Sequence, residues 1–249
     1  MFRELRGLAR SIAVYHLDFA KRRRGLALYS SFVRPGDLVF DLGAHTGGRV
    51  GWFRALDARV VAVEPNPALL RVIRLFHGRD PNVAIEPVAI GREAGRMTLH
   101  YSTGNPMLTT LDGAWVESAK RTEGFDHVEW DRREQVAVRT LDQLIVAHGR
   151  PDFVKIDVEA AEADVLSGLS APVPALSFEV LNTQQARAEQ CLDILEALGP
   201  HRYRYSPLES FALEPGGWID AAEMKALLRS LPPEVTSGDV YARGAPSGG

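Results

Sequence analysis

Cysteine is almost absent from this chain of 249 residues, in which Cys191 is the only one. A lone thiol excludes an intrachain disulfide framework and suits a reducing compartment, so we expect a cytoplasmic protein. The chain also has no apolar run as long as a membrane span and no signal-peptide pattern at its start. With a net charge of −3 and a hydrophobic content of 45%, it is expected to fold around a sizeable core and to have no nucleic-acid partner.

The sequence shows no metal-binding motif. His100, His127 and His148 do not have the spacing of metal ligands, and the one cysteine adds no further ligand set. We therefore predict no metal site. A divalent cation is compatible with the chemistry considered below, but no motif indicates one.

A glycine-rich turn after an apolar strand is the segment around which the chain is organised. Leu38–Leu42 is apolar and β-prone, Gly43–Gly48 is rich in small residues, and apolar residues recur at helical spacing up to Leu56. Strand, glycine turn and helix form the opening unit of a nucleotide-binding α/β sheet. The glycines let the backbone turn sharply and approach a ligand without a Cβ clash.

A second unit follows directly. Arg59–Glu64 has the pattern of a buried strand that ends in an acid, and Pro65-Asn66-Pro67 begins the next helix. Glu64 lies about twenty residues beyond the first glycine, which is the spacing expected of a carboxylate that binds both ribose hydroxyls. The two units together predict a site for an adenosine compound.

Asp41 indicates which adenosine compound is bound. A dinucleotide site needs Gly-x-Gly-x-x-Gly, because the pyrophosphate rests on bare backbone N–H groups, and the order in Gly43–Gly48 does not fit. A carboxylate at the end of the first strand would repel a pyrophosphate, but it suits a ligand that carries an ammonium and a sulfonium. S-adenosylmethionine is such a ligand. The alternative is that Asp41 only caps the turn.

The third strand and its exit, Val83–Ile90, follow a helix over Pro67–Phe76. Exits of neighbouring strands lie side by side in a doubly wound sheet, so Val88 and Ala89 are expected to cover the adenine, although they could equally be plain core. His45 is assigned first to a cofactor contact, with a general base or a helix cap as alternatives. The residues assigned to the cofactor are Asp41, Gly43, Ala44, His45, Gly47, Glu64, Pro65, Asn66, Val88, Ala89 and Asp157.

Another stretch rich in acids begins at Phe153. Phe153–Ile156 reads as a central strand, Asp157 and Glu159 follow at its carboxyl end, and a helix is expected from Ala160 to Leu169. The next strand, Ala175–Val180, contains Glu179 near its end. We assign Asp157, Glu159 and Glu179 as candidate catalytic residues, because ligands bind at the carboxyl ends of strands. Alternatively, Glu159 is an acid favoured by a helix dipole, and Glu179 is paired with Lys155 or an arginine.

The remaining pattern predicts the outer parts of the fold. Residues 1–31 form an N-terminal helical segment, residues 32–243 the main domain, and residues 244–249 a loose tail. Within the domain, an insertion at about 96–139 has two paired strands around the polar segment Ser102–Arg133. We interpret this segment as a substrate lid because it contains scattered aromatic residues, with a binding loop or a disordered segment as alternatives. The basic run Lys21–Arg24 is either a solvated helix end or a contact with an anionic partner. Further elements are predicted at Thr140–Ile145, Asn182–Leu198, His201–Tyr205, Ser210–Leu213, Ala221–Leu231 and Asp239–Arg243.

Four segments together resemble the FkbM-family methyltransferases. They are Phe40–Gly47, Val63–Pro67, Thr140-Leu141-Asp142 and Phe153–Glu159. The resemblance implies a Rossmann-like class I methyltransferase fold of class α/β, with a seven-stranded, mostly parallel sheet, one antiparallel strand and helices on both faces. It also implies O-methylation of a hydroxyl on a sugar or natural product with S-adenosylmethionine. Ala160 departs from the family, which usually has glycine there, so a special backbone angle at this position would be costly.

Methyl transfer from a sulfonium is a direct displacement, so the protein mainly aligns the reactants and accepts a proton. The predicted partner is a small hydroxyl-bearing acceptor, and the oligomeric state stays open. The first alternative is a nicotinamide-dependent oxidoreductase, against which the missing dinucleotide fingerprint stands. The second is a non-catalytic binding module that keeps the fold and has lost methyl transfer.

Overall fold

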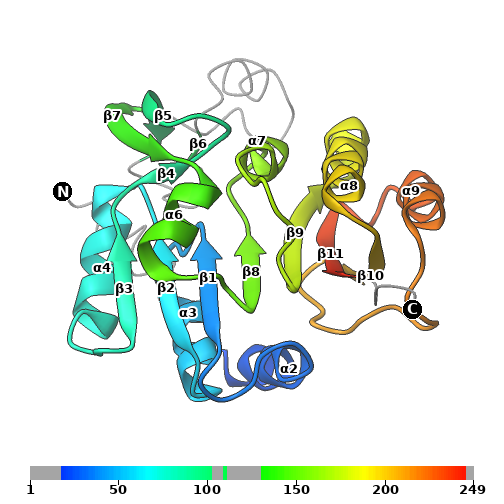
Figure 1. Cartoon of the computed structure of the whole chain (residues 1–249), viewed down its shortest axis with the longest axis horizontal. Helices are drawn as coiled ribbons and strands as arrows, with labels where there is room; N and C mark the ends of the chain where they lie inside the picture. Colours follow the sequence, from blue (N-terminus) through cyan, green and yellow to red (C-terminus); the bar gives the residue numbers. More distant parts are fainter. Residues whose placement is uncertain (1–17, 103–108, 111–129, 245–249) are drawn as a thin grey trace.

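The computed structural model describes residues 18–102, 109–110 and 130–244, and its central feature is a seven-stranded sheet of order β10-β11-β9-β8-β1-β2-β3 (Figure 1). All neighbouring pairs are parallel except those made by β11, which runs antiparallel to both β9 and β10. The strands are β1 (Leu38–Leu42), β2 (Arg59–Val63), β3 (Val83–Glu86), β8 (Phe153–Ile156), β9 (Ala175–Leu181), β10 (His201–Pro207) and β11 (Ser237–Gly244). The predicted class I methyltransferase fold is confirmed.

Helices cover both faces of this sheet because its strands are apolar on both sides. Leu38, Phe40 and Leu42 of β1 belong to the core on one face, and Val39 belongs to the core on the other. This double burial is typical of parallel sheets. The first core packs against α6 (Leu141–His148), α7 (Glu162–Ser167), α8 (Gln185–Leu198) and α9 (Ala221–Arg229). The second packs against α2 (Phe19–Tyr29), α3 (Gly48–Ala55) and α4 (Pro67–His77).

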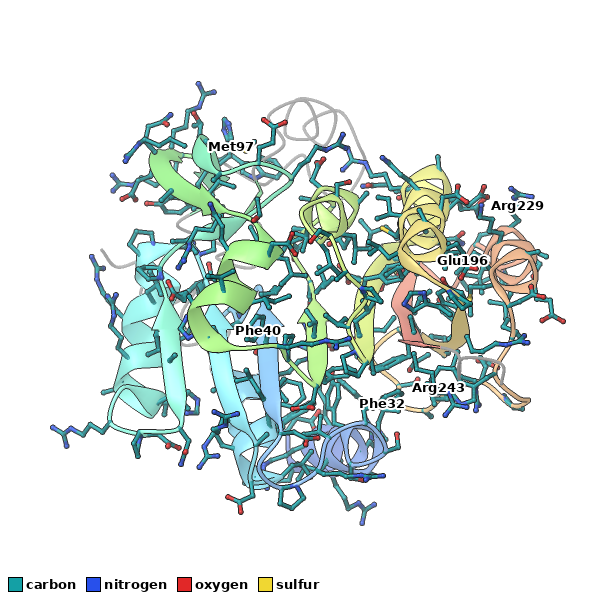
Figure 2. All side chains as sticks on the ribbon, viewed as in Figure 1. Phe32, Phe40, Met97, Glu196, Arg229 and Arg243 are labelled. Atoms are coloured by element: carbon teal, nitrogen blue, oxygen red, sulfur yellow. The ribbon has the colours of Figure 1, made fainter. Side chains whose placement is uncertain are left out.

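Aromatic rings fill the core under α2 and α3. Tyr29 makes an edge contact with Phe53, with ring centroids 4.8 Å apart, and another with Phe153 at 5.9 Å. Phe32, which follows α2 and is labelled in Figure 2, stacks on Tyr241 of β11 with ring centroids 5.1 Å apart. These contacts join α2 and the segment after it to α3, to β8 in the middle of the chain and to β11 near its end.

A second, four-stranded sheet of order β4-β7-β5-β6 lies beside the main sheet (Figure 1). Its strands are β4 (Ala89–Ile90), β5 (Gly95–Tyr101), β6 (Thr109–Thr110) and β7 (Arg132–Arg139). The predicted pairing of the two strands of the insertion is correct, and the structure shows it to be antiparallel, since Gly95 pairs with Val138 and Tyr101 with Arg132. The lid interpretation of Ser102–Arg133 falls largely outside the described residues, as do most of the N-terminal segment and the tail.

Three predicted elements differ from the structure. Val83–Ile90 is two strands in two different sheets, because the chain leaves the main sheet after Glu86 and pairs with β7. The helix expected from Ala160 begins only at Glu162, because Ala160 has a left-handed φ of 77°. Ser210–Leu213 is not a strand, since Phe211 also has a left-handed φ, of 53°, and turns into the core.

Candidate active site

A cavity of about 350 Å³ opens at the carboxyl ends of the parallel strands. Its wall takes residues from the ends of β1, β2, β8 and β9, from the start of β11, and from the second sheet. Six carboxylic acids line it, namely Glu64, Asp157, Glu159, Glu179, Glu209 and Asp239. The other lining residues are Gly43, His45, Arg49, Val63, Pro65, Leu69, Val88, Ala89, Ile90, Leu99, Val158, Leu208, Ser237 and Gly238.

The loop after β1 comes into backbone contact with the loop after β8. Gly43 has a φ of 80°, and a Cβ atom there would lie 1.8 Å from the carbonyl oxygen of Asp157. Gly47 also has a φ of 80° and serves as the N-cap of α3, while His45 has a φ of 53°. A side chain at Gly43 would therefore force the two loops apart, whereas one at Gly47 would meet the His77 ring of α4, whose nearest atom would lie 2.9 Å from the added Cβ.

Glu64 is held rigidly at the end of β2. Its carboxylate accepts hydrogen bonds from the backbone N–H of His45 at 3.0 Å and from that of Asn66 at 2.8 Å. The residue is 4% exposed, and burial raises its pKa to about 8 despite these two bonds. The carboxylate thus joins the loops after β1 and β2, and each oxygen has a lone pair left for a ligand hydroxyl.

Asp41 lies in β1 and does not line the cavity. It is 1% exposed, and neither carboxylate oxygen accepts a hydrogen bond from the residues that the structure describes. Burial raises the pKa of this carboxyl, although the charges of Lys155 and Arg49 act in the opposite direction. Because Asp41 pairs with Lys155 across β1 and β8, it contributes charge beneath the loops rather than a surface of the cavity.

The end of β8 carries an ion pair and a strained turn. Lys155 is buried and donates a hydrogen bond of 2.7 Å to Asp157. Burial alone would raise the pKa of Asp157, but the charges of Lys155 and Arg49 outweigh it and lower that pKa. Glu159 and Ala160, with φ of 57° and 77°, are both in the left-handed region that favours glycine. The turn projects Glu159 into the cavity wall, where burial and Asp157 raise its pKa.

Glu179 and Asp239 form a second acidic pair. They lie directly opposite each other in the antiparallel pairing of β9 and β11, and both line the cavity. Burial raises the pKa of Glu179 to about 10, with the charge of Asp157 as the next cause. Burial raises that of Asp239 only to about 6, because Arg49 and Lys155 counteract it.

Arg49, in the first turn of α3, adds positive charge to the wall. Its guanidinium lies 3.5 Å from the carboxylate of Glu209, which also forms an ion pair with Lys21 of α2. Lys21 is 5% exposed, so the solvated reading of the basic run is wrong for this residue. The two cations anchor the segment after β10 that carries Leu208 and Glu209 over the cavity.

The structure brings most of the assigned residues into one wall. Nine of them line the cavity, namely Gly43, His45, Glu64, Pro65, Val88, Ala89, Asp157, Glu159 and Glu179. The cavity is not lined by four further assigned residues, Asp41, Ala44, Gly47 and Asn66. Ala44 packs in the core, and Asn66 caps α4 by accepting a hydrogen bond of 3.0 Å from the N–H of Ala68.

Sequence reasoning missed several residues of the wall, among them Arg49 and Asp239. The motifs contain no signal for Arg49, which reads as an ordinary helix residue. Asp239 stands at the start of an apolar strand, and its position beside Glu179 follows only from the antiparallel insertion of β11.

Neither a metal centre nor a membrane segment is found in the described part of the chain. Within residues 18–102, 109–110 and 130–244, no group of three or more His, Cys, Asp or Glu side chains could hold a metal ion. In the same residues no helix is long and apolar enough to cross a membrane.

Comparison with solved structures finds distant likeness. A precorrin-6y C5,15-methyltransferase from Geobacter metallireducens has 13% identity and a TM-score of 0.44, covering 90% of this chain and 87% of the other. An S-adenosylmethionine-dependent O-methyltransferase from Thermotoga maritima has 11% identity and a TM-score of 0.43, and the match covers 91% of this chain and 66% of the other. Fibrillarin of Aeropyrum pernix, solved with S-adenosylmethionine, has 13% identity and a TM-score of 0.44, and the match covers 89% of this chain and 75% of the other. Likeness this distant identifies no substrate.

Among curated proteins, no sequence matches the chain significantly. The family described as methyltransferase FkbM domain matches residues 41–206, which include the end of β1, the acid after β2 and the acids after β8 and in β9. Apart from Phe40, the match covers the four segments that carry the resemblance, and it favours methyl transfer over the nicotinamide-dependent alternative. The chain therefore belongs to the FkbM family of S-adenosylmethionine-dependent methyltransferases.

Proposed function

We propose that the chain transfers a methyl group from S-adenosylmethionine to a hydroxyl of a sugar or natural-product small molecule. The observation that carries this proposal is the acidic wall at the ends of five adjacent strands, with Glu64, Asp157 and Glu179 among its carboxylic acids. Of the acids in this wall, Asp157 has a lowered pKa and Asp239 has a pKa of about 6, so both are ionised at neutral pH. Their charge suits a ligand with a sulfonium and an ammonium and would repel a pyrophosphate.

The residues present fit this cofactor. Gly43 makes a close backbone approach that a Cβ atom would block, and the fixed carboxylate of Glu64 has free lone pairs for the ribose hydroxyls. Val88 and Ala89 offer an apolar surface for the adenine. Asp157 is the candidate for the ammonium, and Arg49 for the methionyl carboxylate.

When bound, the cofactor supplies an electrophilic methyl group on a positively charged sulfur. The chain's own residues must then orient an acceptor hydroxyl and take up its proton. The acids at the β8, β9 and β11 side of the cavity are suited to that task, because most of them lie beyond the residues assigned to the nucleoside.

A transfer assay tests the proposal. The purified chain is incubated with S-adenosylmethionine carrying a labelled methyl group and with a panel of sugars and hydroxylated natural products, beside matched amines and thiols. We expect label in a methyl ether, identified by mass spectrometry. Label only in amines or thiols would refute O-methylation, and cofactor binding without any transfer would favour the non-catalytic module.

A further inference from the structure

The cavity has a direction that follows from the order of the strands. Its wall passes from Glu64 on β2, through Gly43 and Asp157 after β1 and β8, to Glu179 on β9 and Asp239 on β11. Neighbouring strands lie about 4.8 Å apart, so these five strand ends span roughly 19 Å. A nucleoside whose ribose is held at Glu64 therefore leaves the β9 and β11 end for a second molecule.

That far end is formed by two carboxyl groups in direct register. Directly opposite residues of antiparallel strands point to the same side of the sheet, with Cβ atoms roughly 4.5–5.5 Å apart. Glu179 and Asp239 have this relation, and both line the cavity while remaining partly accessible. Two carboxyl groups at such a distance favour holding one proton between them.

The surroundings decide which of the two keeps the charge. Arg49 and Lys155 both act on Asp239 and lower its pKa against the effect of burial, which leaves it at about 6. The pKa of Glu179 is raised by burial and then by Asp157 and Glu159, to about 10. At neutral pH the pair thus offers an ionised acceptor at Asp239 and a hydroxyl donor at Glu179.

We propose that the Glu179–Asp239 pair is the acceptor subsite, in which Asp239 takes the proton of the reacting hydroxyl and Glu179 donates a hydrogen bond to an oxygen of the same acceptor. The inference rests on the function proposed above. Asp239 accepts the hydroxyl proton while the hydroxyl oxygen bonds to the methyl carbon and the carbon–sulfur bond breaks, its electron pair remaining on sulfur. The products are a methyl ether, a neutral thioether and a protonated carboxyl group, so charge and atoms balance.

Two nucleoside analogues test this without a known acceptor. S-adenosylhomocysteine lacks the methyl group, whereas sinefungin carries a primary amine, protonated at neutral pH, in the region of the methyl group. The affinities of both are measured by calorimetry at pH 7.5 for the native chain, Asp239→Asn and Glu159→Gln. Glu234→Gln is the matched control, because Glu234 is an exposed carboxylate just before β11.

We expect the preference of the native chain for sinefungin over S-adenosylhomocysteine to fall about tenfold in Asp239→Asn, the lower end of what a hydrogen bond to a charged group contributes. Binding of S-adenosylhomocysteine should change less than threefold, and Glu234→Gln should match the native chain. If circular dichroism shows that Asp239→Asn is not folded, Asp239→Ser supplies the same comparison with a smaller side chain.

Other outcomes would overturn the inference. An unchanged preference in the Asp239 variants, or a loss confined to Glu159→Gln, would move the acceptor subsite to the end of β8. If the native chain binds S-adenosylhomocysteine but shows no preference for sinefungin, the subsite fails while the proposed function stands. If it binds neither analogue, both fail.

Discussion

Ala160 should destabilise the fold through its backbone, and replacing it with glycine tests this directly. Its φ of 77° lies in the left-handed region, which costs an L-residue about 1–2 kcal/mol relative to glycine. Ala161 provides the matched control, because its φ is −116° and the chemical change is the same. Both substitutions remove a methyl group and add freedom to the unfolded chain, so these costs largely cancel in the comparison.

We therefore expect Ala160→Gly to be more stable than Ala161→Gly. Ala160 is only 8% exposed and loses a better-packed methyl group, so the expected difference is about 1 kcal/mol, at the lower end of the range. For a chain of this size, this corresponds to roughly 2–4 °C in the thermal midpoint. Urea and thermal unfolding followed by circular dichroism measure it. If Ala160→Gly is equally or less stable than Ala161→Gly, the turn is not strained and the reasoning is wrong.

Three further predictions concern the wall of the cavity. Gly43→Ala should lose about 3 kcal/mol or more of stability in urea unfolding, because its Cβ would meet the carbonyl of Asp157. Gly95→Ala is the control and should behave like the native chain, because the space around Gly95 is open. Equal stabilities of the two variants would contradict the close approach at Gly43. Glu64→Gln should weaken S-adenosylhomocysteine binding at least tenfold in calorimetry, since an amide NH2 would replace an oxygen that accepts from a backbone N–H and is free to accept from a ribose hydroxyl; unchanged affinity would remove this residue from the site. The pKa of Glu64 in the folded protein is about 8 and that of Glu179 is about 10, both above the ordinary value of 4.5. The ligand-free protein should therefore lose stability as pH rises from 5 to 9, and Glu179→Gln should reduce that loss. A urea midpoint that rises over this range would contradict the assignment.

The elements that sequence reasoning found correctly are those whose pattern is local. β1 and β2 are short apolar runs bounded by turn residues, and each has the length of a buried strand. Thr140 caps α6 by accepting a hydrogen bond of 3.2 Å from the N–H of Gln143, and the two residues form a capping box. A capping box can be recognised from four consecutive residues of the sequence. Glu64 was found by its spacing from the glycine turn, which the fold fixes.

The elements that were missed depend on contacts distant in sequence. The alternation in Ser210–Leu213 resembles a strand, but Phe211 packs against Trp52 with ring centroids 5.2 Å apart, and the backbone turns to allow it. The position of Arg49 in the cavity wall depends on its contact with Glu209, which lies 160 residues later in the chain. No local pattern contains either relation.

The cavity wall combines segments from Gly43 to Asp239, so almost the whole described chain must be folded before the site exists. A nucleoside therefore binds only the native state there, because no single strand–helix unit of the chain contains the whole site. At a free concentration one hundred times its dissociation constant, it would add about 2.7 kcal/mol to the free energy of unfolding. Occupancy by the methyl donor would thus protect distant helices from global unfolding as effectively as it protects the strands that it touches.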